Sequence, residues 1–186
     1  LFGFIAFGQE FIILWAGPDY ADAYYMALMI FVALYIPVIQ NLGVTILQAR
    51  NQMRFRSILY VCIALLALVA EFVFAKQWGG IGCAMAISGA LLLGQGLIMN
   101  IYYQRVQHLN IISFWKQVIK MNLMPISVTA LSLFITHTLY VIDTWPKLVM
   151  GIAVFTAMYI PLCWNLSMNQ YERNLITKPI LNTLRR

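Results

Sequence analysis

Six long apolar segments, separated by short polar interruptions, make up most of this 186-residue chain. A helix that crosses the hydrocarbon core of a bilayer needs about 20 mainly apolar residues. The segments are continuous, whereas the strands of a membrane barrel alternate between apolar and polar positions. The pattern therefore predicts an all-α, polytopic transmembrane helix bundle of about six helices, at residues 1–16, 24–47, 57–74, 81–103, 121–142 and 148–166.

Basic residues are concentrated in alternate interruptions. Ten of the twelve Lys and Arg residues follow the second, fourth and sixth segments. These ten are Arg50, Arg54, Arg56, Arg105, Lys116, Lys120, Arg173, Lys178, Arg185 and Arg186. Because cytoplasmic loops carry an excess of Lys and Arg, we expect these loops and the tail at 167–186 to be cytoplasmic. The loops that hold Asp19, Trp78 and Asp143 are then expected outside.

The composition agrees with a membrane protein. Apolar residues are 62% of the chain and charged residues 10%, against about half and a quarter in soluble domains. The net charge of +6 belongs to residues that border apolar segments, so we expect a lipid bilayer as the partner and no nucleic acid. We interpret residues 1–186 as a single transmembrane domain, the C-terminal part of a longer transporter, because Leu1 already lies inside an apolar segment.

The sequence contains no enzyme motif. The three cysteines lie in apolar segments without metal-ligand spacing, and we interpret them as packing residues. His108 and His137 have no nearby nucleophile or carboxylate in the pattern. We therefore expect a protein that is not an enzyme, with no catalytic residue, no cofactor and no metal.

Polar residues inside the apolar segments are the candidates for a transport pathway. Polar and ionisable groups are costly in hydrocarbon and are often functional there. Four of them are predicted to line or border the route of a substrate: Glu10, Gln40, Asn41 and Gln95. The alternative is that they only form hydrogen bonds between helices.

Two further features are expected to be structural. The fourth segment is rich in Gly, Ala and Ser, which let helices approach closely, and Gly89 is expected on the contact face. Residues 112–120 are predicted to form a separate interfacial turn of helix, with Ser113 as its N-cap.

Several short phrases together resemble the C-terminal half of Wzx-like polysaccharide flippases, which belong to the MOP superfamily of multidrug, oligosaccharidyl-lipid and polysaccharide exporters. They are LWAGPDY at 14–20, QARNQ at 48–52, GGIGCAMA at 79–86, NIYY at 100–103, FWK at 114–116 and YER at 171–173. The resemblance implies two helical lobes around a central cavity, of which this chain supplies the second. The missing N-terminal lobe of the same protein is then a partner.

The same resemblance implies a function. Such a protein would flip undecaprenyl-diphosphate-linked oligosaccharide across the bacterial cytoplasmic membrane during surface polysaccharide biosynthesis. Two alternatives stay open: a cation-coupled exporter of drugs or other small molecules from the same superfamily, and a membrane scaffold subunit that transports nothing.

Overall fold

The computed structural model describes residues 1–138, 140–167, 173 and 177, and within these ranges it is helical with no β-strand. The all-α class predicted from the sequence is thus confirmed for the described part of the chain. The elements are α1 (Phe2–Ala16), η1 (Pro18–Tyr20), α2 (Asp22–Ile39), α3 (Asn41–Ala49), α4 (Arg54–Leu91), η2 (Leu92–Ile98), α5 (Met99–Arg105), α6 (Ile111–Thr138), α7 (Trp145–Leu162) and η3 (Cys163–Ser167).

Four helical stretches are long and apolar enough to cross a membrane: Pro18–Ile39, Arg54–Arg105, Ile111–Thr136 and Trp145–Asn165. Their large apolar side chains are widely exposed, and Leu65 and Phe72 of α4 are 59% and 72% exposed. Such exposure suits lipid and would penalise a protein in water. The chain is therefore an all-α membrane protein; a count of six crossing helices stays a prediction.

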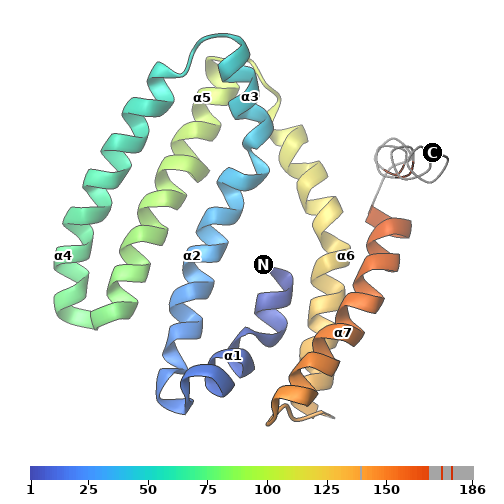
Figure 1. Cartoon of the computed structure of the whole chain (residues 1–186). Helices are drawn as coiled ribbons and strands as arrows, with labels where there is room; N and C mark the ends of the chain where they lie inside the picture. The colour runs from blue at the N-terminus through green and yellow to red at the C-terminus, as the bar shows by residue number, and fades with distance from the viewer. Residues whose placement is uncertain (139, 168–172, 174–176, 178–186) are drawn as a thin grey trace, which may run out of the picture. The chain divides into compact units, whose positions relative to one another are not determined.

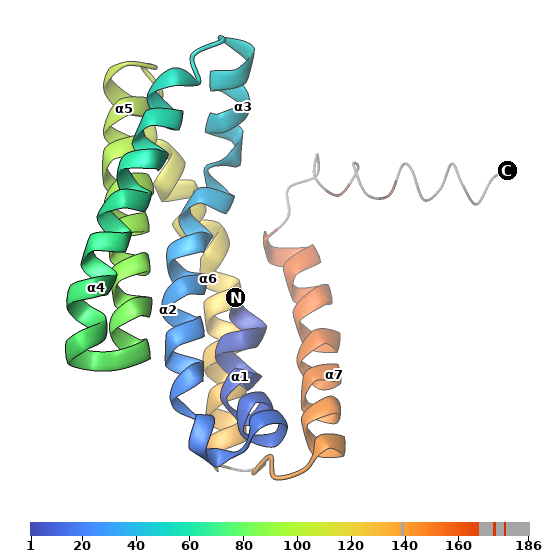
Figure 2. The same cartoon turned by 60° about the vertical axis from the view of Figure 1, so that its left-hand side comes forward.

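The stretch Arg54–Arg105 reverses direction at Gly79. Its 52 residues would extend about 78 Å as one helix, far beyond the hydrocarbon thickness of about 30 Å. Gly79 has φ 56° and ψ −133°, a conformation that glycine adopts without a steric penalty. Figures 1 and 2 show the two arms of α4 running antiparallel on either side of this turn. We call residues 54–78 the first arm and 80–91 the second arm, which η2 and α5 continue.

The predicted segment 24–47 covers two helices, because α2 ends at Ile39 and α3 begins at Asn41. Pro37 lies in the last turn of α2. It has no N–H to donate to the preceding turn, which weakens the helix there. At the break itself the Gly43 N–H donates to the Gln40 carbonyl, only three residues back, at 2.9 Å.

The predicted interfacial turn at 112–120 is not a separate element. Residues 112–120 belong to α6, a single helix of 28 residues that begins at Ile111. Ser113 therefore lies inside α6, and its prediction as an N-cap is wrong. The physical reason is that Lys116 and Lys120 signal a polar surface but favour helix as strongly as most residues do. At about 42 Å, α6 exceeds the hydrocarbon thickness, so charged residues can lie on it outside the lipid core.

The chain divides into two compact units, each described here by itself. Unit 1 contains Trp15–Ile112 together with Leu1, and unit 2 contains Phe2–Leu14 and Ser113–Arg186. The core of unit 1 joins α3, α4 and α5 through Leu47, Leu59, Ile63, Ala90, Met99 and Tyr103. The core of unit 2 joins α1 to α7 through Ala6, Phe7 and Leu148, and Phe7 packs edge-on against Phe155 with ring centres 5.6 Å apart.

Glycines allow the second arm to contact a neighbour on each side. A Cβ added at Gly82 would lie 2.3 Å from the Phe74 carbonyl oxygen of the first arm. On the side of α2, a Cβ at Gly80 would lie 3.1 Å from the sulfur of Met26. Gly89, by contrast, has nothing within 4 Å of such a Cβ. The expectation that Gly89 lies at a close contact is wrong, because small residues occur on several sides of this helix and only some of them face a neighbour.

Candidate functional site: buried amides at the break between α2 and α3

Gln40 occupies the break between α2 and α3 and is only 4% exposed. Its Nε2 donates a hydrogen bond of 2.8 Å to Oδ1 of Asn100 on α5. The Asn100 Nδ2 in turn donates to the carbonyl oxygen of Gly96 in η2 at 2.5 Å. These contacts form a chain of amide groups between two helical segments that are 60 residues apart in sequence. The break matters because it brings a polar side chain and its backbone into an otherwise apolar packing layer.

The chain of amide groups ends at Gly96, which lies in a π-helix. Over Leu92–Ile98 the helix is wider than an α-helix, and the Met99 N–H donates to the carbonyl five residues back, on Gly94. Gln95 lies in this segment and is 2% exposed. It precedes Asn100 by about one turn of such a helix, in which bonded residues are five apart. Short π-helical segments are frequent at functional sites.

Two polar atoms of this site are buried without a hydrogen-bond partner. They are Oε1 of Gln40, an acceptor, and Nε2 of Gln95, a donor. A buried polar group without a partner costs about 1–3 kcal/mol, and hydrocarbon surroundings offer no water to replace one. A hydroxyl group can both donate and accept a hydrogen bond. Each of the two atoms is thus an unused donor or acceptor of the kind that a hydroxyl group can complement.

The structure places the other predicted pathway residues elsewhere. Asn41 is exposed at the start of α3, where its carbonyl oxygen accepts a hydrogen bond of 3.2 Å from the Thr45 hydroxyl. Glu10 is half-buried on α1, which belongs largely to unit 2. Of the four residues, Gln40 and Gln95 are the two on the elements joined by the amide chain. The role of Glu10 and Asn41 in a pathway stays a prediction.

Asn100 is a site residue that belongs to the polar residues inside the apolar segments but is not among the four predicted pathway residues. The sequence marks it as one more polar residue in the fourth apolar segment. Its spacing of four residues from Gly96 lets its Nδ2 bond to the carbonyl one turn earlier in its own helical stretch, which leaves its Oδ1 for a partner on another helix. Its pairing with Gln40 depends on the reversal at Gly79, which no local pattern reveals.

Unit 2 contains an apolar cavity of about 360 Å³ between α1, α6 and α7. The residues that line it are Phe7, Val128, Leu131, Ser132, Ile135, Thr136, Tyr140, Met150, Gly151, Val154, Phe155 and Met158. The Thr136 hydroxyl is bonded within α6, to the Leu133 carbonyl at 3.0 Å. The volume lies at the lower end of the range for small-molecule sites. The lining favours an apolar occupant.

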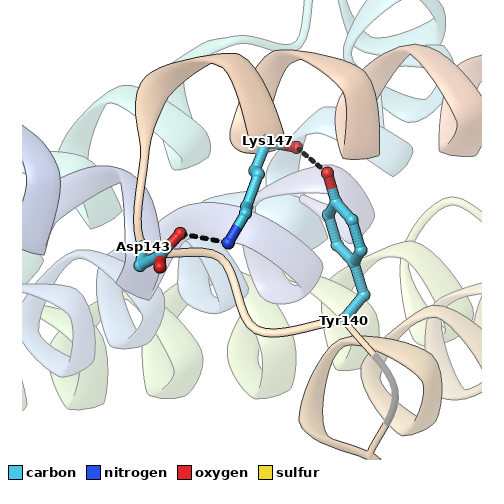
Figure 3. Close-up of polar contacts among 3 residues, drawn as sticks. All are labelled: Tyr140, Asp143 and Lys147. Carbon is cyan, nitrogen blue, oxygen red and sulfur yellow. Dashed lines mark hydrogen bonds and ion pairs between the residues drawn. The ribbon is translucent and has the colours of Figure 1, made fainter.

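The connection between α6 and α7 is held by polar contacts that are structural in character. The Lys147 ammonium lies 2.5 Å from an oxygen of the Asp143 carboxylate, and the Tyr140 hydroxyl donates to the Lys147 carbonyl at 3.4 Å. Figure 3 shows how the three residues lie. The hydrogen bond from Lys147 lowers the pKa of Asp143 below its usual value. Both charged side chains are exposed, so the pair fastens the start of α7 without forming an enclosed site.

Within the described residues, no three His, Cys, Asp or Glu side chains are grouped so that they could hold a metal ion. Comparison of the chain with known protein families, curated proteins and solved structures gives no match.

Proposed function

We propose that this chain is the C-terminal part of a transporter that flips undecaprenyl-diphosphate-linked oligosaccharide across the bacterial cytoplasmic membrane, with the C-terminus on the cytoplasmic side. The proposal joins the resemblance of the sequence to polysaccharide flippases with the chemistry of the amide site. The protein acts as a carrier, not as an enzyme, and the N-terminal lobe of the same protein completes the route.

The observation that carries the proposal is the pair of buried atoms without partners, Gln40 Oε1 and Gln95 Nε2. A glycan presents many hydroxyl groups, each able to accept from one amide and donate to another. Amides bind such groups without fixing a charge in the membrane. Amides also bind hydroxyl groups weakly enough to release the substrate, because hydrogen bonds in such bundles contribute about 0.6 kcal/mol on average.

The apolar cavity in unit 2 suits the same class of substrate. A lipid-linked glycan carries a long hydrocarbon tail as well as a polar head. A cavity of about 360 Å³ lined mainly by apolar side chains can hold several methylene groups of such a tail, which exchange contacts with lipid for van der Waals contacts with these side chains.

Complementation of a strain that lacks the full-length gene tests the function. Surface polysaccharide is measured per amount of membrane-inserted protein, for the variants Gln40→Ala and Gln95→Ala. Gln77→Ala is the matched control, because Gln77 is an exposed glutamine on the first arm. We expect a several-fold loss of surface glycan for the two buried positions at unchanged protein amount, and no loss for the control.

The outcomes separate the alternatives. If the deletion strain keeps its surface glycan and no second flippase is encoded, the flippase assignment is wrong. Sensitivity of that strain to drugs would instead favour a cation-coupled exporter, for which the half-buried carboxylate Glu10 on α1 is the residue to substitute first. A normal glycan together with normal drug tolerance would indicate a scaffold.

A further inference from the structure

In unit 1, side-chain hydrogen bonds join the segment after α3 to the segment after α5, which is far from it in sequence. Arg50, at the end of α3, donates through Nη1 to Oε1 of Gln107 at 2.7 Å. The Gln107 Nε2 donates to Oε1 of Gln52 at 2.6 Å, and Gln107 is only 3% exposed. Beside them the rings of Phe55 and Tyr102 are stacked with centres 4.1 Å apart. The start of α4 therefore lies against the end of α5 (Figure 1).

This junction collects four arginines at one end of unit 1: Arg50, Arg54, Arg56 and Arg105, which we call the arginine cluster. The sequence has no Asp or Glu from residue 40 to 70 or from 92 to 112. No ion pair in the described part of the chain involves a member of the cluster.

The contacts of the cluster leave its charge uncompensated. Arg50 is bonded to the neutral amide of Gln107. Arg56 donates to the Tyr60 hydroxyl at 3.0 Å and lies over the Tyr60 ring, 5.1 Å from its centre. Helix α4 begins at Arg54, so the positive end of its dipole adds to the cluster. Arg50 and Arg105 lie at the C-terminal ends of α3 and α5, whose partial negative charges offset only part of the four full positive charges. The result is a concentrated positive charge with a requirement for external anions.

The cluster borders the part of α4 that faces lipid. Ile58 and Val61, on the turns that follow Arg54, are 65% and 61% exposed. Such side chains belong in hydrocarbon, which places the arginines that precede them at the level of the lipid headgroups. An anion that is supplied at this level is the phosphate of a phospholipid, and the planar guanidinium group binds phosphate with two parallel hydrogen bonds.

We propose that the arginine cluster binds the headgroups of anionic phospholipids, with the exposed Arg54 and Arg105 as the main contacts and Gln107 positioning Arg50. The inference depends on the chain being a membrane protein and is independent of what the protein transports. The partner is the bilayer lipid itself.

The test measures lipid binding to the purified protein in neutral detergent. Phosphatidylglycerol or phosphatidylcholine is titrated, and retained lipid is counted by native mass spectrometry. We expect phosphatidylglycerol to bind more tightly. Arg54→Gln and Arg105→Gln should each weaken that binding about fivefold, the effect of one basic residue near an anionic lipid surface. Lys76→Gln is the matched control, since Lys76 is exposed on α4 near Gly79, and it should leave the affinity unchanged.

Further measurements identify the ligand and control for misfolding. Arg54→Lys keeps the charge and should keep most of the affinity. The melting temperature in neutral detergent should be the same for all variants, and a variant that melts lower is replaced by its Lys form at the same position. Equal loss for Lys76→Gln would overturn the site in favour of general attraction. Competition by inorganic phosphate at matched ionic strength would overturn the lipid assignment in favour of a soluble anion.

Discussion

Ile63, on the first arm of α4, fills the space beside Gly94, where a Cβ would lie only 1.9 Å from the Ile63 Cδ1 atom. The two residues lie on antiparallel stretches of helix, and the contact brings the backbone of η2 close to the first arm. Close approach of this kind is the main source of attraction between helices in a membrane, because lipid removes the hydrophobic driving force.

We expect Gly94→Ala to lower the melting temperature in detergent, whereas Gly89→Ala should leave it unchanged or raise it. An added methyl group at Gly94 overpacks the contact, which costs typically about 1–3 kcal/mol. At Gly89 there is free space, and the change from Gly to Ala favours helix by up to about 1 kcal/mol. In the background Ile63→Ala, Gly94→Ala should cost less, and equal costs in both backgrounds would contradict the contact.

The hydrogen bond between Gln40 and Asn100 should be measurable as a coupling energy. In a double-mutant cycle of Gln40→Ala and Asn100→Ala, we expect coupling of about 0.6 kcal/mol and no more than about 1.7 kcal/mol. The measurement is reversible unfolding in mixed micelles. Additive effects of the two substitutions would show that the amides do not stabilise each other in the folded protein.

The contact between Asp143 and Lys147 predicts a dependence of stability on acid. The pKa of Asp143 is lowered from its ordinary value of 3.8 by the hydrogen bond from Lys147. A carboxyl with a lowered pKa stabilises the fold above its unfolded pKa, and this contribution is lost as the pH falls through the folded value. Asp143→Asn should therefore lower the melting temperature at pH 6 and have no effect well below pH 3.8. Asp19→Asn serves as the control, and an equal effect at both pH values would exclude the ion pair as the cause.

Orientation in the membrane is the fourth prediction. Arg54 and Trp78 lie at opposite ends of the first arm, about 36 Å apart along the helix. After replacement of Cys62, Cys83 and Cys163 by Ala, a cysteine at 78 should react with an impermeant reagent in intact cells, and one at 54 should not. Labelling at 54 alone would reverse the proposed orientation.

The sequence predicted the elements that depend on composition over many residues. Continuous apolar segments indicate membrane helices because the cost of an exposed backbone in lipid leaves few other structures. Details that depend on one or two side chains were harder to predict from the sequence. The break at Gln40 follows Pro37, yet a proline inside a membrane helix does not say whether the helix kinks or ends.

The candidate site was predicted only in part for a similar reason. Polar residues in apolar surroundings are visible in the sequence, and Gln40 and Gln95 were selected on that basis. Their geometry depends on the π-helical segment at Leu92–Ile98, which has no recognisable sequence pattern. Likewise, the glycines that contact neighbours, Gly82 and Gly94, cannot be told from Gly89 until the neighbouring helix is known.

The reversal at Gly79 also bears on how the chain folds. Because the turn is so short, the residues on either side of it, such as Phe74 and Gly82, meet with little loss of chain entropy. Contacts farther from the turn, such as that of Ile63 with Gly94, can then form one after another. The arms can therefore enter the bilayer as a preformed helical hairpin, to which α2 and α3 are added. A β-branched residue at position 79 cannot adopt this conformation without strain, so the substitution should slow insertion as well as destabilise the finished protein.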